Sequence, residues 1–216
     1  MRRWQLHAIA DGTPLARAVQ LEMHGGIRIG RWAPFTAIQR LSVDERFVWA
    51  ATGRPFGVPV IGFHRWTRSS GEMRWRLCGA VPRISATKED VTRSAAGRHA
   101  GELLVSLPTA ALSPEVSLRP LDFRRAVATV RAGGGSHEVT LTVDADGRLT
   151  ELAMQRWGPA GRGTFALQPF GAALSGEATS GGVTVPQRIT AGWHHGTHGW
   201  DAGQFIGWTV DAARHC

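Results

Sequence analysis

Strict alternation of apolar and charged side chains in one short segment constrains the fold of this chain most. Within residues 72–77 the apolar side chains are Met73, Trp75 and Leu77, and the charged side chains between them are Glu72, Arg74 and Arg76. A period of two is the spacing of side chains on one face of a β-strand. The segment therefore predicts a strand with one buried and one wet face, which is typical of an antiparallel sheet exposed on one side.

The same pattern recurs along most of the chain. Further strands are expected at 19–24, 27–29, 33–41, 46–52, 58–66, 115–119, 125–131, 139–143, 149–157, 164–179, 183–195 and 204–211. Two glycines, Gly25 and Gly26, interrupt one alternating run and predict a tight hairpin, because glycine tolerates positive φ. Asp146-Gly147 lies between two other runs and is a strong hairpin signal.

One segment, 89–107, has the spacing of a helix. Its apolar stripe consists of Ala96, Ala100, Leu103, Leu104 and Leu107. Thr87 is the expected N-cap, Glu89 and Asp90 suit the positive end of the helix dipole, and Pro108 ends the helix.

The order of strands, one helix and more strands predicts a mainly β (α+β) fold. A long antiparallel sheet curls, and its apolar face needs a cover. We therefore expect a curved antiparallel sheet, or half-barrel, wrapped around the principal helix. The 216 residues and 43% hydrophobic content suit a single domain over 1–216, with 1–14 as a short N-terminal helix or arm.

The net charge of +8 does not by itself indicate a partner. The basic residues are almost all arginines, and they are scattered without a basic run, so a nucleic-acid partner is not expected. No segment approaches the roughly 20 apolar residues of a membrane-spanning helix, and no signal peptide is recognisable at the start. These features predict a cytoplasmic protein whose two cysteines, Cys78 and Cys216, are free thiols.

The inward face of the predicted sheet carries the candidate ligand-binding residues. These are Phe47, Trp49, Met73 and Trp75 on the strands and Glu102 on the helix. A concave sheet lined by aromatic side chains can hold an apolar ligand or can be packed solid by the helix, and the sequence leaves both open. Glu102 could face this interior with a raised pKa, or it could pair with Arg98 four residues earlier.

A histidine-rich segment, 192–201, contains the candidate metal ligands His195, His198 and Asp201. Imidazole and carboxylate are suitable zinc ligands, but adjacent His194 and His195 would point to opposite faces of a strand, so a fourth ligand or water would be needed. The alternative is a loop in which the histidines are polar caps. There is no Gly-x-Ser-x-Gly elbow, phosphate-binding loop or dinucleotide fingerprint, and no cofactor is expected.

Several motifs together resemble a known family. They are Trp32-Ala33-Pro34-Phe35-Thr36-Ala37, Phe47-Val48-Trp49-Ala50-Ala51, Gly71-Glu72-Met73-Arg74-Trp75-Arg76-Leu77, Ser94-Ala95-Ala96-Gly97-Arg98, Gly101-Glu102-Leu103-Leu104, Leu107-Pro108-Thr109-Ala110 and Thr184-Val185-Pro186. Over roughly residues 15–210 the chain is similar to an uncharacterised bacterial family, often seen in actinobacteria. The resemblance implies a β half-barrel holding a helix, similar in outline to lipid-binding half-barrels of the LolA and LppX type. This chain lacks their signal peptide and lipidation cysteine, and the resemblance brings no site residues with it.

Three functions are therefore compatible with the sequence. The first is a non-enzymatic protein that encloses a hydrophobic or lipid-like small molecule between sheet and helix. The second is a metal-dependent or acid–base enzyme that uses the 194–201 segment or Glu102. The third is a protein-interaction module, which would present an exposed apolar patch.

Overall fold

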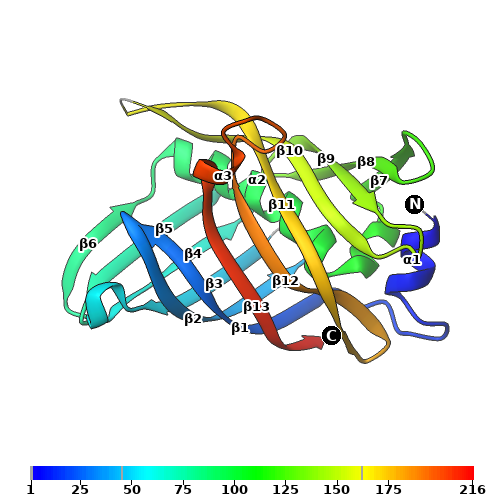
Figure 1. The fold of residues 1–216 in the computed structure, drawn as a ribbon, viewed down its shortest axis with the longest axis horizontal. Coiled ribbons are helices and arrows are strands. Elements are labelled where there is room, and N and C mark those ends of the chain that lie inside the picture. The colour runs from blue at the N-terminus through cyan, green and yellow to red at the C-terminus, as the bar shows by residue number, and fades with distance from the viewer. Residues whose placement is uncertain (1, 45, 162) are drawn as a thin grey trace.

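A single curved, antiparallel sheet forms the framework of the protein. The computed structural model describes residues 2–44, 46–161 and 163–216. Within them, 13 strands are arranged in the order β6-β5-β4-β3-β2-β1-β13-β12-β11-β10-β9-β8-β7, and the sheet curves around helix α2 (Glu89–Ser106) (Figure 1). The predicted mainly β fold, a curved sheet around one principal helix, is confirmed.

The strands before α2 form one half of the sheet. They are β1 (Ala18–Ile29), β2 (Arg31–Ser42), β3 (Arg46–Gly53), β4 (Val60–Thr67), β5 (Ser70–Leu77) and β6 (Val81–Ala86), with α1 (Arg2–Ala8) ahead of them and a short 3-10 helix, η1 (Pro55–Gly57), between β3 and β4. Each strand pairs with its neighbour in the chain, because short connections favour antiparallel hairpins.

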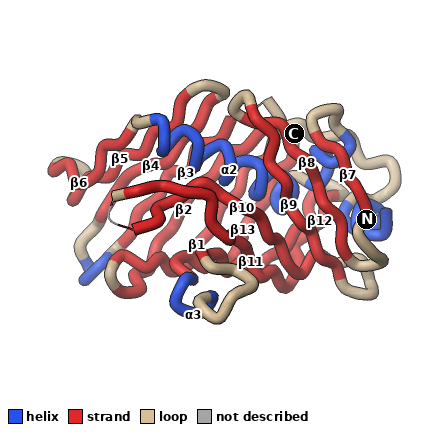
Figure 2. The backbone as a smooth tube through the Cα atoms, turned by 90° about the horizontal axis from the view of Figure 1, so that it is seen from above, coloured by secondary structure: helices blue, strands red, loops and turns tan. Residues whose placement is uncertain are grey.

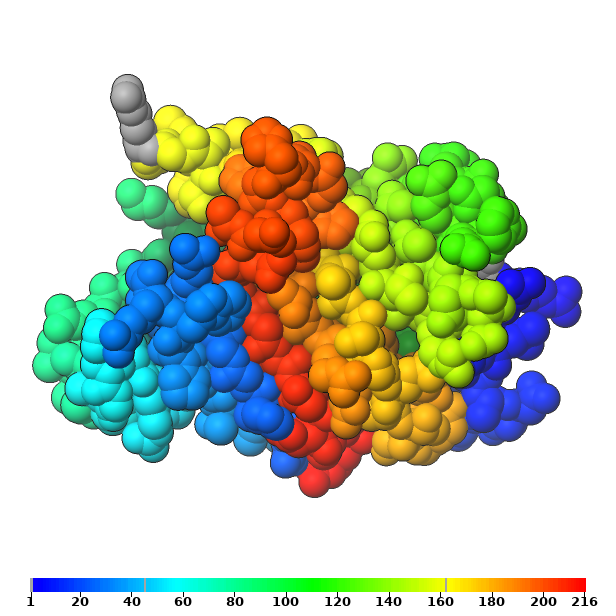
Figure 3. All heavy atoms as spheres, in the orientation of Figure 1, coloured from blue at the N-terminus to red at the C-terminus, as the bar shows by residue number. Residues whose placement is uncertain are grey.

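The strands after α2 form the other half. They are β7 (Val116–Pro120), β8 (Arg125–Ala132), β9 (Gly135–Val143), β10 (Leu149–Gly161), β11 (Thr164–Ser180), β12 (Val183–Trp193) and β13 (Gln204–His215), with η2 (Pro108–Leu112) before β7 and α3 (Trp200–Gly203) before β13. The halves join where β1 pairs with β13, from Val19 opposite His215 to Ile27 opposite Ile206. On the outer surface the β1–β2 hairpin lies beside the loop before β13, and Arg28 donates to the backbone oxygen of Ala202 (Figure 3).

Helix α2 lies in the trough of the sheet and provides much of the core (Figure 2). Its predicted stripe is buried, since Ala100 and Leu104 have no exposed surface and Leu103 retains only 2%. The helix approaches β5 closely at Gly71, whose backbone N–H donates to Oγ1 of Thr92 at 2.9 Å. Burial of these side chains, rather than helix propensity, therefore determines where α2 packs.

Three local predictions need correction. Gly25 and Gly26 do not form a hairpin, because β1 continues through them and turns at Gly30, which has φ 74°. A Cβ on Gly25 would lie 2.1 Å from the backbone oxygen of Gly207, so the glycine is required by the neighbouring strand. The N-cap of α2 is Lys88 and not Thr87.

The third correction concerns Glu72, which is on the outer face of β5 as predicted but is not exposed to solvent. Its side chain is buried because the arginines of the same face cover it, and it forms ion pairs with Arg65 and Arg74. The Asp146-Gly147 hairpin is confirmed between β9 and β10, and Gly147 has the positive φ of 92° that such a turn requires.

Candidate functional site

A cavity of about 980 Å³ lies between α2 and the concave face of the sheet. Strands from both halves contribute to it, and its aromatic lining includes Trp49, Trp75, Phe170, Trp193, Phe205 and Trp208. This volume is at the upper end of the roughly 300–1,000 Å³ that small-molecule sites occupy. The helix therefore fills only part of the trough.

The wall formed by β2, β3 and β5 follows from strand alternation. Trp49 on β3 meets Phe35 on β2 and Trp75 on β5 edge-on, with ring centroids 5.6 and 5.7 Å apart. Gly62 on β4 leaves the space that the Trp75 ring occupies, because a Cβ at this position would lie 2.7 Å from the ring. The inward positions of these strands thus form a continuous aromatic surface.

The opposite wall comes from β11, β12 and β13. Phe170 and Trp193 pack edge-on at 5.1 Å, and Phe205 lies parallel to Trp193 at 6.4 Å. The Trp193 ring lies directly on the backbone of Gly158, where a Cβ would be 2.0 Å from the ring. The Trp193 ring can therefore pack against the β10 backbone only because Gly158 has no side chain.

A polar cluster interrupts the apolar lining where α2 faces β2 and β4. Arg98 donates from Nε to Oε1 of Glu102 at 2.8 Å, and Nε2 of Gln39 donates to Oε2 of the same carboxylate at 2.7 Å. Arg98 also donates to Nδ1 of His64 at 3.0 Å, so the neutral His64 ring carries its proton on Nε2. Burial, with the positive charges of Arg98 and Arg156, holds the pKa of His64 well below its usual value.

Arg156 on β10 is the second cation at the cavity. It is only 7% exposed, and it donates from Nε to the backbone oxygen of Ser94 at 3.2 Å and from Nη2 to the Ser94 hydroxyl at 3.4 Å. Its guanidinium lies over the Phe170 ring at 4.6 Å and over the Trp193 ring at 5.3 Å. Burial lowers the pKa of Arg156 to about 9, which still leaves it charged at neutral pH.

Four of the five residues predicted to bind a ligand line this cavity, namely Trp49, Met73, Trp75 and Glu102. Phe47 shares the inward face of β3 with Trp49 but lies in the packed core, with 1% exposure, between the rings of His64 and His99. Glu102 adopts the predicted pairing with Arg98, and both of its oxygens accept hydrogen bonds.

The structure does not bring the three predicted metal ligands together. Among the described residues no group of three His, Cys, Asp or Glu side chains is placed to hold a metal ion. His195 packs edge-on against Trp200 at 4.6 Å, Asp201 accepts a hydrogen bond from Gln204, and His198 is exposed. The chain turns at His194, which has φ 61°, so the segment leaves the sheet as a loop instead of continuing as a strand.

Sequence reasoning missed Gln39 and His64 of the polar cluster, the aromatic residues Phe170 and Trp193, and the buried cation Arg156. Only for Arg156 does the sequence hold a signal. It follows Leu152 and Met154 at a spacing of two on β10, and all three are buried. A charged residue on the apolar face of a strand is therefore the signal that could have indicated it.

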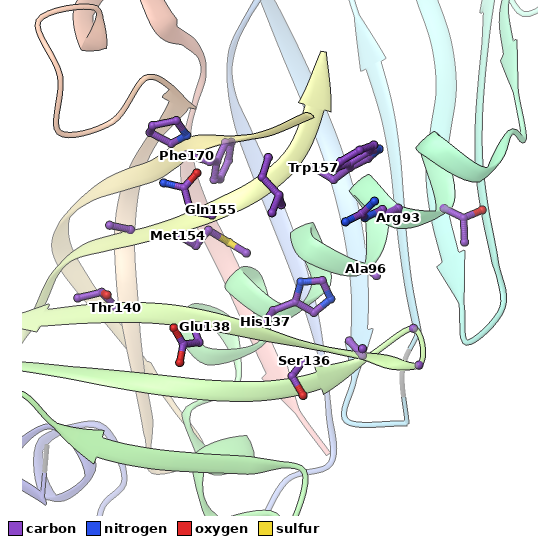
Figure 4. Close-up of a pocket in the computed structure, with 18 of the residues that line it drawn as sticks. Arg93, Ala96, Ser136, His137, Glu138, Thr140, Met154, Gln155, Trp157 and Phe170 are labelled. Carbon is purple, nitrogen blue, oxygen red and sulfur yellow. The ribbon is translucent and has the colours of Figure 1, made fainter. Parts of the chain in front are cut away.

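A second hollow of about 760 Å³ lies on the other side of α2, toward β8, β9 and β10 (Figure 4). Its polar side chains include Arg93, His137 and Glu138, and both Arg93 and Glu138 are exposed. Arg93 lies over the Trp157 ring at 3.6 Å, and the indole N–H of Trp157 donates to Asp90. Because Arg93, Trp157 and Asp90 engage one another, and Arg93 and Glu138 are exposed, the larger and more apolar cavity is the candidate site.

None of the helices in the described parts of the chain combines the length and the apolar character needed to cross a membrane.

Comparison with solved structures finds similar chains at low sequence identity. A DUF1329 family protein from Desulfovibrio piger superposes with a TM-score of 0.51 at 12% identity, over 99% of this chain and 89% of that one. A LolA superfamily protein from Nitrosomonas europaea gives a TM-score of 0.49 at 9% identity, over 99% and 90% of the two chains. A putative outer membrane lipoprotein-sorting protein domain from Vibrio parahaemolyticus gives 0.47 at 6% identity, over 94% and 86%.

Sequence comparison is more decisive than these superpositions. No curated protein matches this chain. A family model, by contrast, matches residues 1–205, which is nearly the whole length. The chain therefore belongs to DUF6544, a family of unknown function.

Proposed function

We propose that this protein binds a hydrophobic or amphipathic small molecule, of lipid-like character, in the cavity between α2 and the curved sheet. The carrying observation is the cavity itself, with a volume of about 980 Å³ and a lining dominated by aromatic and aliphatic side chains. Removing an apolar ligand from water against such walls is favourable by roughly 25 cal/mol for each Å² of apolar surface buried.

The position of the opening supports this proposal. One end of the cavity is lined by Ile29, Phe56 and Val58. Ile29 is the last residue of β1, and the other two lie in the connection between β3 and β4, at the same end of the strands. Their exposed fractions are 49%, 73% and 40%, so apolar surface continues from the interior to the solvent. An apolar molecule would thus have a route to the cavity that does not cross the polar cluster.

The polar cluster favours binding over acid–base catalysis. A general acid or base needs a proton or a lone pair that is free to reach the substrate. Both oxygens of Glu102 accept hydrogen bonds from Arg98 and Gln39, and Nδ1 of His64 accepts one from Arg98. The remaining proton of His64, on Nε2, is on an atom that is buried within the protein and makes no hydrogen bond. These bonds hold the cluster as a fixed polar feature of an otherwise apolar cavity.

The test is native mass spectrometry of the purified protein together with uptake of the apolar dye N-phenyl-1-naphthylamine. We expect either extra mass that is lost on denaturation or saturable dye binding to the empty protein. Ala51 on β3 lines the cavity, so Ala51→Trp should fill it and weaken dye binding at least tenfold.

The matched control is Ala50→Trp, because Ala50 is the preceding residue of the same strand and points to the exposed face. Dye binding by this variant should equal that of the unmodified protein. Absence of both bound mass and dye uptake would overturn the proposal, and so would an equal loss of binding in the two variants.

A further inference from the structure

Arg156 is a buried cation without an anionic partner among the described residues. The other arginine of the polar cluster, Arg98, forms an ion pair with Glu102. A guanidinium has five N–H donors, and the described residues accept two of those on Arg156, both at Ser94. Three donors therefore remain for a group within the cavity.

The charges around Arg156 do not balance. Arg98 and Glu102 neutralise each other, and both Glu102 oxygens are already occupied by Arg98 and Gln39. His64 is neutral because burial and the two arginines lower its pKa. Apart from the exposed Arg83, the polar groups that line the cavity thus carry one net positive charge, which is costly to keep away from water without a counter-charge.

We propose that the ligand is an amphipathic anion whose carboxylate or phosphate head group accepts hydrogen bonds from Arg156, while its apolar tail lies along the aromatic walls. This inference rests on the proposed binding function and specifies its ligand class. The planar guanidinium suits both head groups, because its parallel N–H bonds can reach two oxygens at once. A neutral amphiphile would leave the buried charge unbalanced.

The aromatic neighbours of Arg156 position its free donors. The guanidinium carbon of Arg156 lies over the Phe170 ring at 4.6 Å and over the Trp193 ring at 5.3 Å, and Ser94 accepts hydrogen bonds from Nε and Nη2. These cation–π contacts use none of the N–H bonds as donors, and together with the hydrogen bonds to Ser94 they restrict the side chain. The head group would therefore meet a donor set that is already oriented, which lowers the entropic cost of binding.

The test compares three ligands with the same tail, namely dodecanoate, dodecyl phosphate and dodecanol, by displacement of N-phenyl-1-naphthylamine at neutral pH. We expect at least one of the two anions to bind about 10- to 100-fold more tightly than dodecanol, the range expected for charge-assisted hydrogen bonds in a buried site. The anion that is preferred distinguishes a carboxylate ligand from a phosphate ligand.

Two substitutions test whether Arg156 causes the preference for an anion over dodecanol. Arg156→Met should abolish it while dodecanol still binds, and Arg156→Lys should restore part of it because the charge is kept. The control is Arg40→Met, since Arg40 is exposed on β2 and donates to Gln20 outside the cavity. Circular dichroism checks that each variant is folded.

The outcomes separate this inference from the proposed function. If dodecanol binds to the unmodified protein as tightly as both anions, the cavity binds apolar ligands but the anionic head group is refuted. The same holds if Arg156→Met retains the preference for an anion. If none of the three ligands displaces the dye and no dye binds, the proposed function itself fails.

Discussion

Buried histidines on the concave side couple the core of this protein to pH. His99 on α2 is 1% exposed. The centroid of its ring lies 4.8 Å from that of Trp66 and 6.5 Å from that of Phe47, which points inward from β3. Burial, and then the nearby His137, lower the pKa of His99 from 6.5 to about 4. The folded protein thus holds His99 neutral where the unfolded chain would protonate it.

We predict that His99→Leu makes the protein less sensitive to mild acid. Between pH 4 and 6.5 the unfolded state binds more protons at this residue, so the free energy of unfolding falls as the pH is lowered through that interval. The share of His99 in this loss between pH 7 and pH 4.5 is about 2 kcal/mol. Urea unfolding at both pH values should show a loss smaller by that amount in the variant.

The control for this prediction is His198→Leu, because His198 is exposed in the loop before α3. Its unfolding should depend on pH as that of the unmodified protein does. An unchanged pH dependence in His99→Leu would mean that His99 is not held neutral by its surroundings. His64, His137 and His215, whose pKa values burial also lowers, add to the acid sensitivity of both proteins.

The contact between Gly71 and Thr92 determines how closely the start of α2 packs on β5. A Cβ on Gly71 would lie 2.6 Å from Cα of Thr92, which is backbone and cannot rotate away. Thr92 also accepts the N–H of Gly71 through its hydroxyl, so the first turns of α2 are held on the strand. The absence of a side chain at one strand position therefore fixes the start of the helix.

We predict that Gly71→Val forces α2 away from β5 and destabilises the protein by about 1–3 kcal/mol, the usual cost of overpacking a tight contact. Gly135→Val on β9 is the matched control, because a Cβ there meets only the backbone oxygen of Ala132 at 3.9 Å. Its effect should stay within about 0.5 kcal/mol. Equal urea midpoints for the two variants would show that the Gly71 contact does not constrain the helix.

Elements whose pattern is local were predictable from the sequence. The alternation around Trp75 predicted β5, and the stripe around Leu104 predicted α2, because each depends only on nearby residues and a single period. Gly25 and Gly26 were misread as a turn because the need for glycine at Gly25 comes from Gly207, which is distant in sequence. Local reasoning cannot separate a glycine needed for a turn from one needed by a neighbouring strand.

The site was less predictable for the same reason. Alternation places Phe47 and Trp49 on one face of β3, but only the position of α2 makes the first a core residue and the second part of the cavity wall. Arg156 becomes a feature of the site only because β10 and α2 meet at Ser94. Packing between elements that are distant in sequence decides which inward-pointing residues line the cavity and which lie in the core.

The whole molecule has a trough that its single long helix does not fill. The sheet ends at β6 and β7, and β6 carries Pro82 and Arg83, which are exposed and hinder pairing with another strand. Strands from both sides of the trough, β2–β5 and β10–β13, contribute side chains to the lining of the cavity. A bound ligand would therefore complete a core that spans both halves of the sheet.

We predict that loading the cavity raises the melting temperature of the entire domain in one cooperative transition. A ligand present at a hundred times its Kd stabilises the folded state by about 2.7 kcal/mol, which corresponds to a rise of roughly 5–10 °C for a chain of this length. Differential scanning fluorimetry with dodecanoate should show this rise in the unmodified protein and in Ala50→Trp, and at most about half of it in Ala51→Trp, whose binding is at least tenfold weaker. An equal rise in Ala51→Trp would place the bound molecule outside the cavity, on a surface that the substitution does not reach.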